Sequence, residues 1–162
     1  MLIAAIIVYA VAMTLANLSI ATFGVWVSPI NAFVFIGLDL ALRDWLQIKI
    51  KAWQMAVLIA VSGGLTYALN QDAGMIAVAS AASFTLAAFA DWAVFLKVSG
   101  SWFKRSTESN IAGAAVDSVV FPTIAFGVLM PEIIAWQFSA KVAGGFIWAY
   151  LLNKVQSDSS SV

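Results

Sequence analysis

The stretch AFVFIGLDLALRD, residues 32–44, decides how this chain is organised, because it is an apolar segment that carries charges. Its length and composition predict a buried helix. Asp39 and Arg43 stand four residues apart, so on a helix they share one face and can meet. Placing one charge in hydrocarbon costs about 2.5–3.5 kcal/mol on insertion scales. Two such charges indicate either a polar ligand or contacts that hold helices together.

The composition is typical of an integral membrane protein. The 162 residues are 63% apolar and 10% charged, whereas soluble domains carry about 25% charged residues. The net charge is zero, and no basic face supports binding of nucleic acid. Cys and His are both absent, which removes thiolate and imidazole ligands and the commonest general base. We therefore expect neither an enzyme nor a metal or cofactor site.

Six apolar segments approach the roughly 20 residues that a helix needs to cross a bilayer. They predict an all-α bundle of six transmembrane helices in one domain, residues 1–155, and a disordered polar tail, residues 156–162. The first segment is interpreted as a spanning helix and not as a signal peptide, because no basic region precedes it. The longest predicted loop is Lys97–Ser109. The predicted helices are Leu2–Thr22, Pro29–Leu46, Ala52–Leu69, Met75–Leu96, Asn110–Met130 and Pro131–Leu152.

The basic residues of the links predict the orientation in the membrane. They follow the second, fourth and sixth predicted helices, whereas the links after the first, third and fifth contain no Lys or Arg. A chain of six spans with both termini in the cytoplasm places every basic link on the cytoplasmic side. The residues concerned are Lys49, Lys51, Lys97, Lys104, Arg105 and Lys154.

Five ionisable residues fall well inside the predicted helices, namely Asp39, Arg43, Asp91, Asp117 and Lys141. At about 1.5 Å of rise per residue, Asp39 and Lys141 lie roughly 15 Å deep, near the midplane. Arg43 and Asp91 lie closer to the cytoplasmic boundary, where snorkelling relieves part of the cost of burying a charge. Three carboxylates against two cations leave one negative charge unmatched. A ligand with N–H donors, a bound cation or a transported proton would each compensate it.

Polar and small residues share helical faces with these charges. Asn110 and Gly113 share a stripe with Asp117, Gln137 lies one turn from Lys141, and Ser80, Phe84, Ala87 and Asp91 form a third stripe. If the stripes face inward, they predict a central polar cavity with aromatic walls, as a small-molecule site requires. The structural alternative is that the buried charges only hold the helices together through ion pairs, one between Asp39 and Arg43 and one between Lys141 and either Asp117 or Asp91.

The same residues carry a family resemblance. Phe33–Arg43 resembles the F-x-F-hydrophobic-x-x-D-L-x-x-R stretch of the VUT family, the queuosine precursor transporters. The likeness covers about residues 13–152, although the chain is shorter than typical members, as in compact phage-type versions. Further elements similar to the family's motifs occur in the family's order, at Asn17, Ala81–Asp91, Ser109–Asn110, Val116–Phe121 and Phe138–Val142.

The resemblance implies import of a 7-deazaguanine, such as preQ0 or preQ1, across the bacterial inner membrane through a mid-membrane site. The donor edge of such a base suits a carboxylate, for which we expect Asp117 or Asp39, and its O6 suits a donor such as Lys141 or Asn110. Arg43 is expected to position Asp39. The full set of expected substrate-binding residues is Asn17, Phe35, Asp39, Arg43, Asp91, Asn110, Asp117, Ser118 and Lys141.

Two other functions stay open on the sequence. The chain resembles in size small six-helix vitamin-uptake subunits that dock on an energising ATPase, and it has no Walker motif of its own. A structural or lysis-related membrane protein is the second alternative, for which so many charges on matched stripes are unexpected. Besides the bilayer and a small-molecule substrate, the partners left open are a second copy of the chain and an unidentified energising partner.

Overall fold

The computed structural model describes residues 2–69 and 74–159, and their regular structure is helical throughout. The elements in chain order are α1 (Leu2–Phe23), the 3-10 turn η1 (Val25–Val27), α2 (Ser28–Asn31), the π-helical segment η2 (Ala32–Ile36), α3 (Gly37–Gln47), α4 (Ala52–Leu69), α5 (Gly74–Lys97), α6 (Trp102–Phe126) and α7 (Pro131–Ser159).

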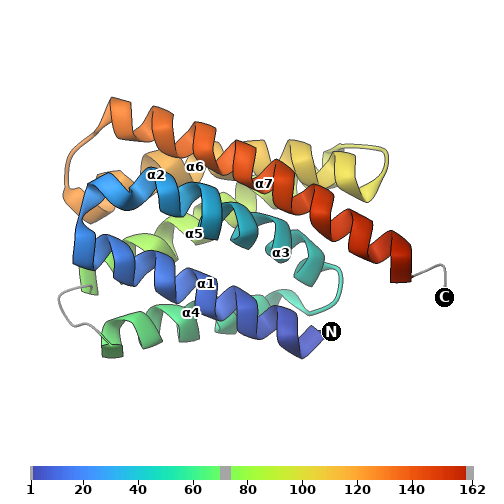
Figure 1. Ribbon diagram of the computed structural model, residues 1–162, viewed down its shortest axis with the longest axis horizontal. Helices are drawn as coiled ribbons and strands as arrows, with labels where there is room; N and C mark the ends of the chain where they lie inside the picture. The colour runs from blue at the N-terminus through green and yellow to red at the C-terminus, as the bar shows by residue number, and fades with distance from the viewer. Residues whose placement is uncertain (1, 70–73, 160–162) are drawn as a thin grey trace.

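The elements from η1 to α3 run into one another as a single helical segment, Val25–Leu46. With α1, α4, α5, α6 and α7 this segment makes a bundle of helices lying roughly alongside one another (Figure 1). Among the described residues, α1, Val25–Leu46, α5 and α6 are each long and apolar enough to cross a membrane. These four helices agree with the predicted all-α membrane protein. The number of six spans and the cytoplasmic location of both termini stay predictions.

The exposed and buried faces of α1 show the polarity expected of a membrane bundle. Ile3, Ile7 and Val11, spaced by four residues, form an exposed apolar stripe. The opposite face buries Asn17, which is 2% exposed, and Tyr9. A helix of a soluble protein shows the reverse arrangement, with its apolar stripe turned to the core. The bundle therefore presents apolar surface outward and collects its polar groups inside.

The links divide between the two ends of the bundle. The residues joining α3 to α4 and those joining α5 to α6 lie at the same end as the start of α1 and the end of α7 (Figure 1). We call this the basic end, because Lys49, Lys51 and Lys97 lie there. The link from α1 to η1 and the link from α6 to α7 lie at the opposite end. This is the grouping of links that the sequence predicts.

Two predicted boundaries are wrong. The residues interpreted as the loop Lys97–Ser109 mostly belong to α6, which begins at Trp102. Ser101 caps this helix by accepting a hydrogen bond from the Lys104 backbone N–H at 3.3 Å. Arg105 donates to the Phe95 carbonyl from Nε at 3.1 Å and Nη2 at 2.9 Å, which satisfies a backbone acceptor near the end of α5.

The helix at the C-terminal end is also longer than predicted. α7 continues to Ser159, so residues 156–159 are helical where the sequence predicts a disordered tail; residues 160–162 of that tail lie outside the described residues. The turn expected at residues 70–74 is described only at Gly74, where α5 begins.

Close contact between α7 and the helical segment before Asp39 depends on two glycines. A Cβ on Gly37 would lie 2.6 Å from the Gly144 carbonyl carbon, and a Cβ on Gly144 would overlap the Phe33 backbone carbonyl. Small residues allow membrane helices to approach at this distance. The contact falls beside η2, a π-helical turn of the kind that often accompanies functional sites.

Candidate functional site

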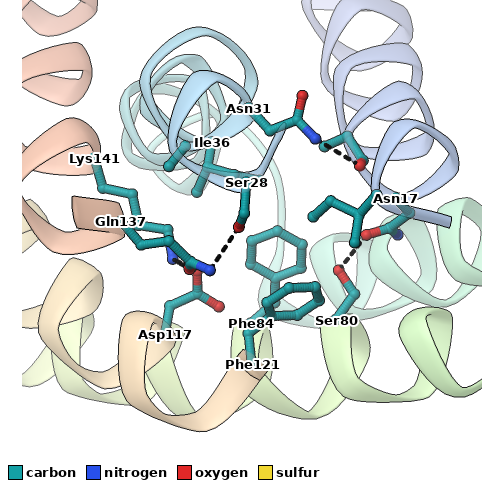
Figure 2. A pocket seen from close by; sticks show the side chains of 13 residues that line it. Asn17, Ser28, Asn31, Ile36, Ser80, Phe84, Asp117, Phe121, Gln137 and Lys141 are labelled. Carbon is teal, nitrogen blue, oxygen red and sulfur yellow. Dashed lines mark hydrogen bonds and ion pairs between the residues drawn. The ribbon is translucent and has the colours of Figure 1, made fainter. Parts of the chain in front are cut away.

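A small cavity of about 20 Å³ lies inside the bundle, toward the end opposite the basic end. A volume of this size holds roughly one water molecule. Figure 2 shows polar side chains on two sides of the cavity and two aromatic rings between them. We call it the central cavity; its lining residues are Ala16, Asn17, Ile20, Ser28, Asn31, Ala32, Ile36, Ser80, Phe84, Asp117, Phe121, Gln137 and Lys141.

Lys141, on α7, is the centre of the first polar side. Its ammonium group lies 2.7 Å from Asp117 Oδ2, and it donates hydrogen bonds to Gln137 Oε1 at 2.9 Å and Ser118 Oγ at 3.2 Å. Gln137 in turn donates from Nε2 to Ser28 Oγ at 2.6 Å. The three ammonium protons thus have three partners, which is the condition under which a buried lysine is tolerated.

The second polar side is built by α1, α2 and α5. Ser80 donates to Asn17 Oδ1 at 2.7 Å, and Asn31 donates to the Ala16 carbonyl at 3.0 Å and Ser19 Oγ at 2.6 Å. These bonds hold amide and hydroxyl groups at the cavity wall facing the Lys141 side (Figure 2).

The rings of Phe84 and Phe121 lie between the two polar sides (Figure 2). Phe84 is 2% exposed and Phe121 is 6% exposed. Aromatic faces flanked by a few convergent hydrogen-bonding groups are the usual lining of a site for a flat polar molecule.

A second polar group, which we call the Arg43 cluster, lies nearer the basic end and consists of Asp39, Arg43, Asp44, Asp91, Ser106 and Asn110. Arg43 Nη2 lies 3.8 Å from Asp91 Oδ2. Ser106 donates to Asp44 Oδ2 at 2.5 Å, and Asn110 donates to Ser106 Oγ at 3.4 Å.

The space for the guanidinium depends on Gly113, which belongs to α6. A Cβ at this position would lie 3.2 Å from Arg43 Nη2 and 3.3 Å from Asp91 Cβ. The predicted stripe on this helix therefore does face inward, but Gly113 and Asn110 face the Arg43 cluster while Asp117 faces the central cavity.

The Arg43 cluster corrects two expectations. Arg43 forms its ion pair with Asp91 on α5, and the predicted pair with Asp39 is not formed at ion-pair distance among the described residues. Arg43 and Asp91 are also 0% exposed, so neither reaches water by snorkelling as predicted. The neighbouring helices cover them, which depth along a single helix does not reveal.

The expected substrate-binding residues divide between the two groups. Asn17, Asp117 and Lys141 line the central cavity, and Ser118 contacts Lys141. Phe35 is half-buried and is not part of the cavity lining. The remaining expected residues, Asp39, Arg43, Asp91 and Asn110, lie in the Arg43 cluster.

Sequence reasoning missed several polar residues that the structure adds. Ser28 and Asn31 line the cavity, and Asp44 and Ser106 are buried in the Arg43 cluster. All four lie near a predicted helix end or inside a predicted loop, where a polar residue is expected to face water. A signal existed only for Asp44, because it follows Arg43 directly inside a predicted span.

The buried charges do not balance. In the described part of the chain the buried carboxylates are those of Asp39, Asp44, Asp91 and Asp117, whereas the buried cations are Arg43 and Lys141. Within the described ranges, no group of acidic side chains has the arrangement needed to hold a metal ion. The central cavity therefore offers a paired charge and neutral hydrogen-bonding groups, and the Arg43 cluster carries the excess of acid.

Comparison of the chain with protein-family models, with curated proteins and with solved structures gives no match.

Proposed function

We propose that this protein is a membrane transporter that imports a 7-deazaguanine base of the preQ0 or preQ1 type, and that the base binds in the central cavity. The observation that carries the proposal is the juxtaposition of the Asp117–Lys141 pair with the rings of Phe84 and Phe121. The resemblance of the sequence to queuosine precursor transporters supplies the substrate class.

The chemistry of the cavity suits such a base. A 7-deazaguanine presents a ring N–H and an exocyclic amine along one edge, and a carboxylate such as Asp117 accepts two donors side by side. The adjacent O6 is an acceptor, and the ammonium group of Lys141 lies 2.7 Å from the same carboxylate. Phe84 and Phe121 supply apolar faces for the flat ring. Asn110, the other residue expected near O6, lies outside this lining, so we assign that contact to Lys141, which exchanges its 3.2 Å hydrogen bond with Ser118 for one to O6 when the base binds.

The structure corresponds to a closed state in this proposal. A cavity of about 20 Å³ is far too small for a bicyclic base. Entry of the base therefore requires the helices to separate, and alternating access around one site is the usual way in which secondary transporters achieve this. The entry side is the end opposite the basic end, because Ser28 stands three residues from the start of its helical segment, roughly 5 Å along the helix.

Ligand-induced thermal stabilisation of the purified protein in detergent tests the proposal. PreQ0 and preQ1 should raise the unfolding temperature with increasing concentration, because a ligand that binds only the folded state stabilises it by mass action. Adenine should not, because it presents an amine where the deazaguanines present O6. Asp117→Asn and Lys141→Met should each abolish the shift.

The matched control is Thr123→Val, on the same helix as Asp117. Thr123 is exposed, and its hydroxyl donates to the Val119 carbonyl of its own helix, at 2.6 Å, so this variant should keep the shift. If no deazaguanine stabilises the wild-type protein, or if Asp117→Asn retains the full shift, the proposal is wrong.

A further inference from the structure

The Arg43 cluster contains more buried acid than base. Asp39, Asp44 and Asp91 surround one guanidinium, and the exposed fractions are 0%, 1% and 0% for the carboxylates and 0% for Arg43. Fully ionised, the group would hold three negative charges and one positive charge. The other buried pair, Asp117 with Lys141, is balanced and does not offset the excess.

Several atoms of this group lack the partners that ionised groups require. Both carboxylate oxygens of Asp39, both of Asp91 and Oδ1 of Asp44 are buried and form no hydrogen bond of regular geometry among the described residues. Asp91 Oδ2 has its ion pair with Arg43 Nη2, at 3.8 Å, and the carboxyl groups of Asp44 and Asp91 lie close enough to interact with each other. The hydroxyl of Tyr9, from α1, is likewise buried without a hydrogen bond of regular geometry, and it interacts with Asp39 and Arg43. An ionised carboxylate in such surroundings is costly, and in practice the group becomes neutral by binding a proton.

We propose that the Arg43 cluster is a proton-binding site, which holds two protons in this closed state. Two protons convert two of the three carboxylates into neutral carboxylic acids and leave the third to balance Arg43. The charged and titratable groups that face the site are Tyr9 from α1, Asp39, Arg43 and Asp44 from α3, Asp91 from α5 and, at longer range, Asp117 from α6 and Lys141 from α7.

A proton fits the site better than a metal cation does. The Arg43 guanidinium interacts most strongly with Asp91, then with Asp39 and Asp44, so a metal ion among these carboxylates would also meet a fixed positive charge. In residues 2–69 and 74–159, no cluster of acidic side chains is arranged to hold a metal ion. A proton forms an O–H bond with one carboxylate oxygen and needs no further ligands.

The position of the site indicates that the protons move together with the base, an inference that rests on the proposed transport function. Asp44 stands three residues from the end of α3, roughly 5 Å along the helix, at the basic end. The central cavity lies toward the opposite end. Protons taken up from water on the cavity side and released to water at the basic end would accompany the base, so that proton entry drives import.

Infrared absorption of the substrate-free protein tests proton binding directly. A protonated carboxylic acid has a carbonyl stretch that an ionised carboxylate lacks. We expect this band at neutral pH in the wild type, and its partial loss in Asp39→Asn and in Asp44→Asn. Glu108→Gln, which alters an exposed ion pair, should leave the band unchanged.

If a variant fails to fold, the carboxylic acid band of the folded wild-type protein, followed as a function of pH, still decides the test. Absence of the band at neutral pH in the folded wild type would overturn the proposal, as would a band that only Asp117→Asn removes.

Coupling is tested in proteoliposomes that contain a pH-sensitive dye and the wild-type protein. Addition of preQ1 outside should acidify the interior, and an inwardly directed proton gradient should raise uptake severalfold. Uptake of the base without proton movement would refute coupling. If the band is present but no deazaguanine binds, the proposed substrate fails while proton binding by the Arg43 cluster stands.

Discussion

The buried ion pair of the central cavity allows a quantitative test of how the bundle is held together. Lys141 Nζ and Asp117 Oδ2 are 2.7 Å apart, and the two side chains are 2% and 5% exposed. At an effective dielectric constant of about 20, opposite unit charges at this distance attract by roughly 6 kcal/mol before desolvation is subtracted. Removal of one member of such a pair typically costs about 3–5 kcal/mol, because the other charge stays buried without a partner.

Lys141→Met is the perturbation, because methionine keeps most of the length of the side chain and removes the charge. A loss of about 3–5 kcal/mol corresponds to a fall of roughly 6–20 °C in the unfolding temperature for a chain of this size. Unfolding in detergent, followed by tryptophan fluorescence, measures it. The double variant with Asp117→Asn should be less destabilised than Lys141→Met alone, since no unpaired charge remains.

The control is the exposed pair of Lys104 and Glu108, at 3.8 Å, in which the side chains are 59% and 45% exposed. Lys104→Met removes a lysine of the same kind and should cost no more than about 0.5 kcal/mol. Equal shifts for Lys104→Met and Lys141→Met would refute the reasoning, and so would a double variant that is no more stable than Lys141→Met.

Three further predictions concern packing and hydrogen bonding, and each is measured by the same unfolding assay. Gly144→Ala should destabilise by at least about 1–3 kcal/mol, because its Cβ overlaps a backbone carbonyl on the facing helix, whereas Gly64→Ala, which has open space, should be neutral or stabilising. Ser101→Ala should cost about 0.5–2 kcal/mol through loss of the α6 cap. Ser106→Ala should cost about 1–3 kcal/mol, because Asp44 loses its hydroxyl donor; a cost below about 0.5 kcal/mol would contradict the assigned burial.

Helical periodicity was sufficient to predict which residues face inward. Ser80, Asp117, Gln137 and Lys141 all line the central cavity, and Asn110 lies on the inner face of its helix. A helix fixes the angle between successive side chains, so one charged residue that must avoid lipid orients its whole stripe. This is why the polar interior could be predicted without knowledge of the contacts between helices.

Partners across helices could not be predicted in the same way. Asp39 is compatible with Arg43 by spacing, yet the ion pair forms with Asp91, which is 48 positions further along the chain. Spacing shows that two residues of one helix can meet, whereas helix packing decides whether another carboxylate comes closer. Depth along a single helix was misleading for Arg43 and Asp91 for a related reason, because neighbouring helices cover both side chains and each is 0% exposed.

Asp39 connects the two polar groups, and its place makes a purely structural role a poor explanation of the interior. Its carboxylate interacts electrostatically with Arg43 and also with Lys141. Among the described residues it forms no ion pair and no hydrogen bond of regular geometry, so its contact with the Tyr9 hydroxyl is a weak link between helices. A change in its charge would alter the surroundings of both cations together. Small-residue contacts such as Gly37 with Gly144 already bring the helices together, so their close packing does not require a buried acid here. An acid that is shared between a candidate substrate cavity and a candidate proton site is instead what coupling of the two requires.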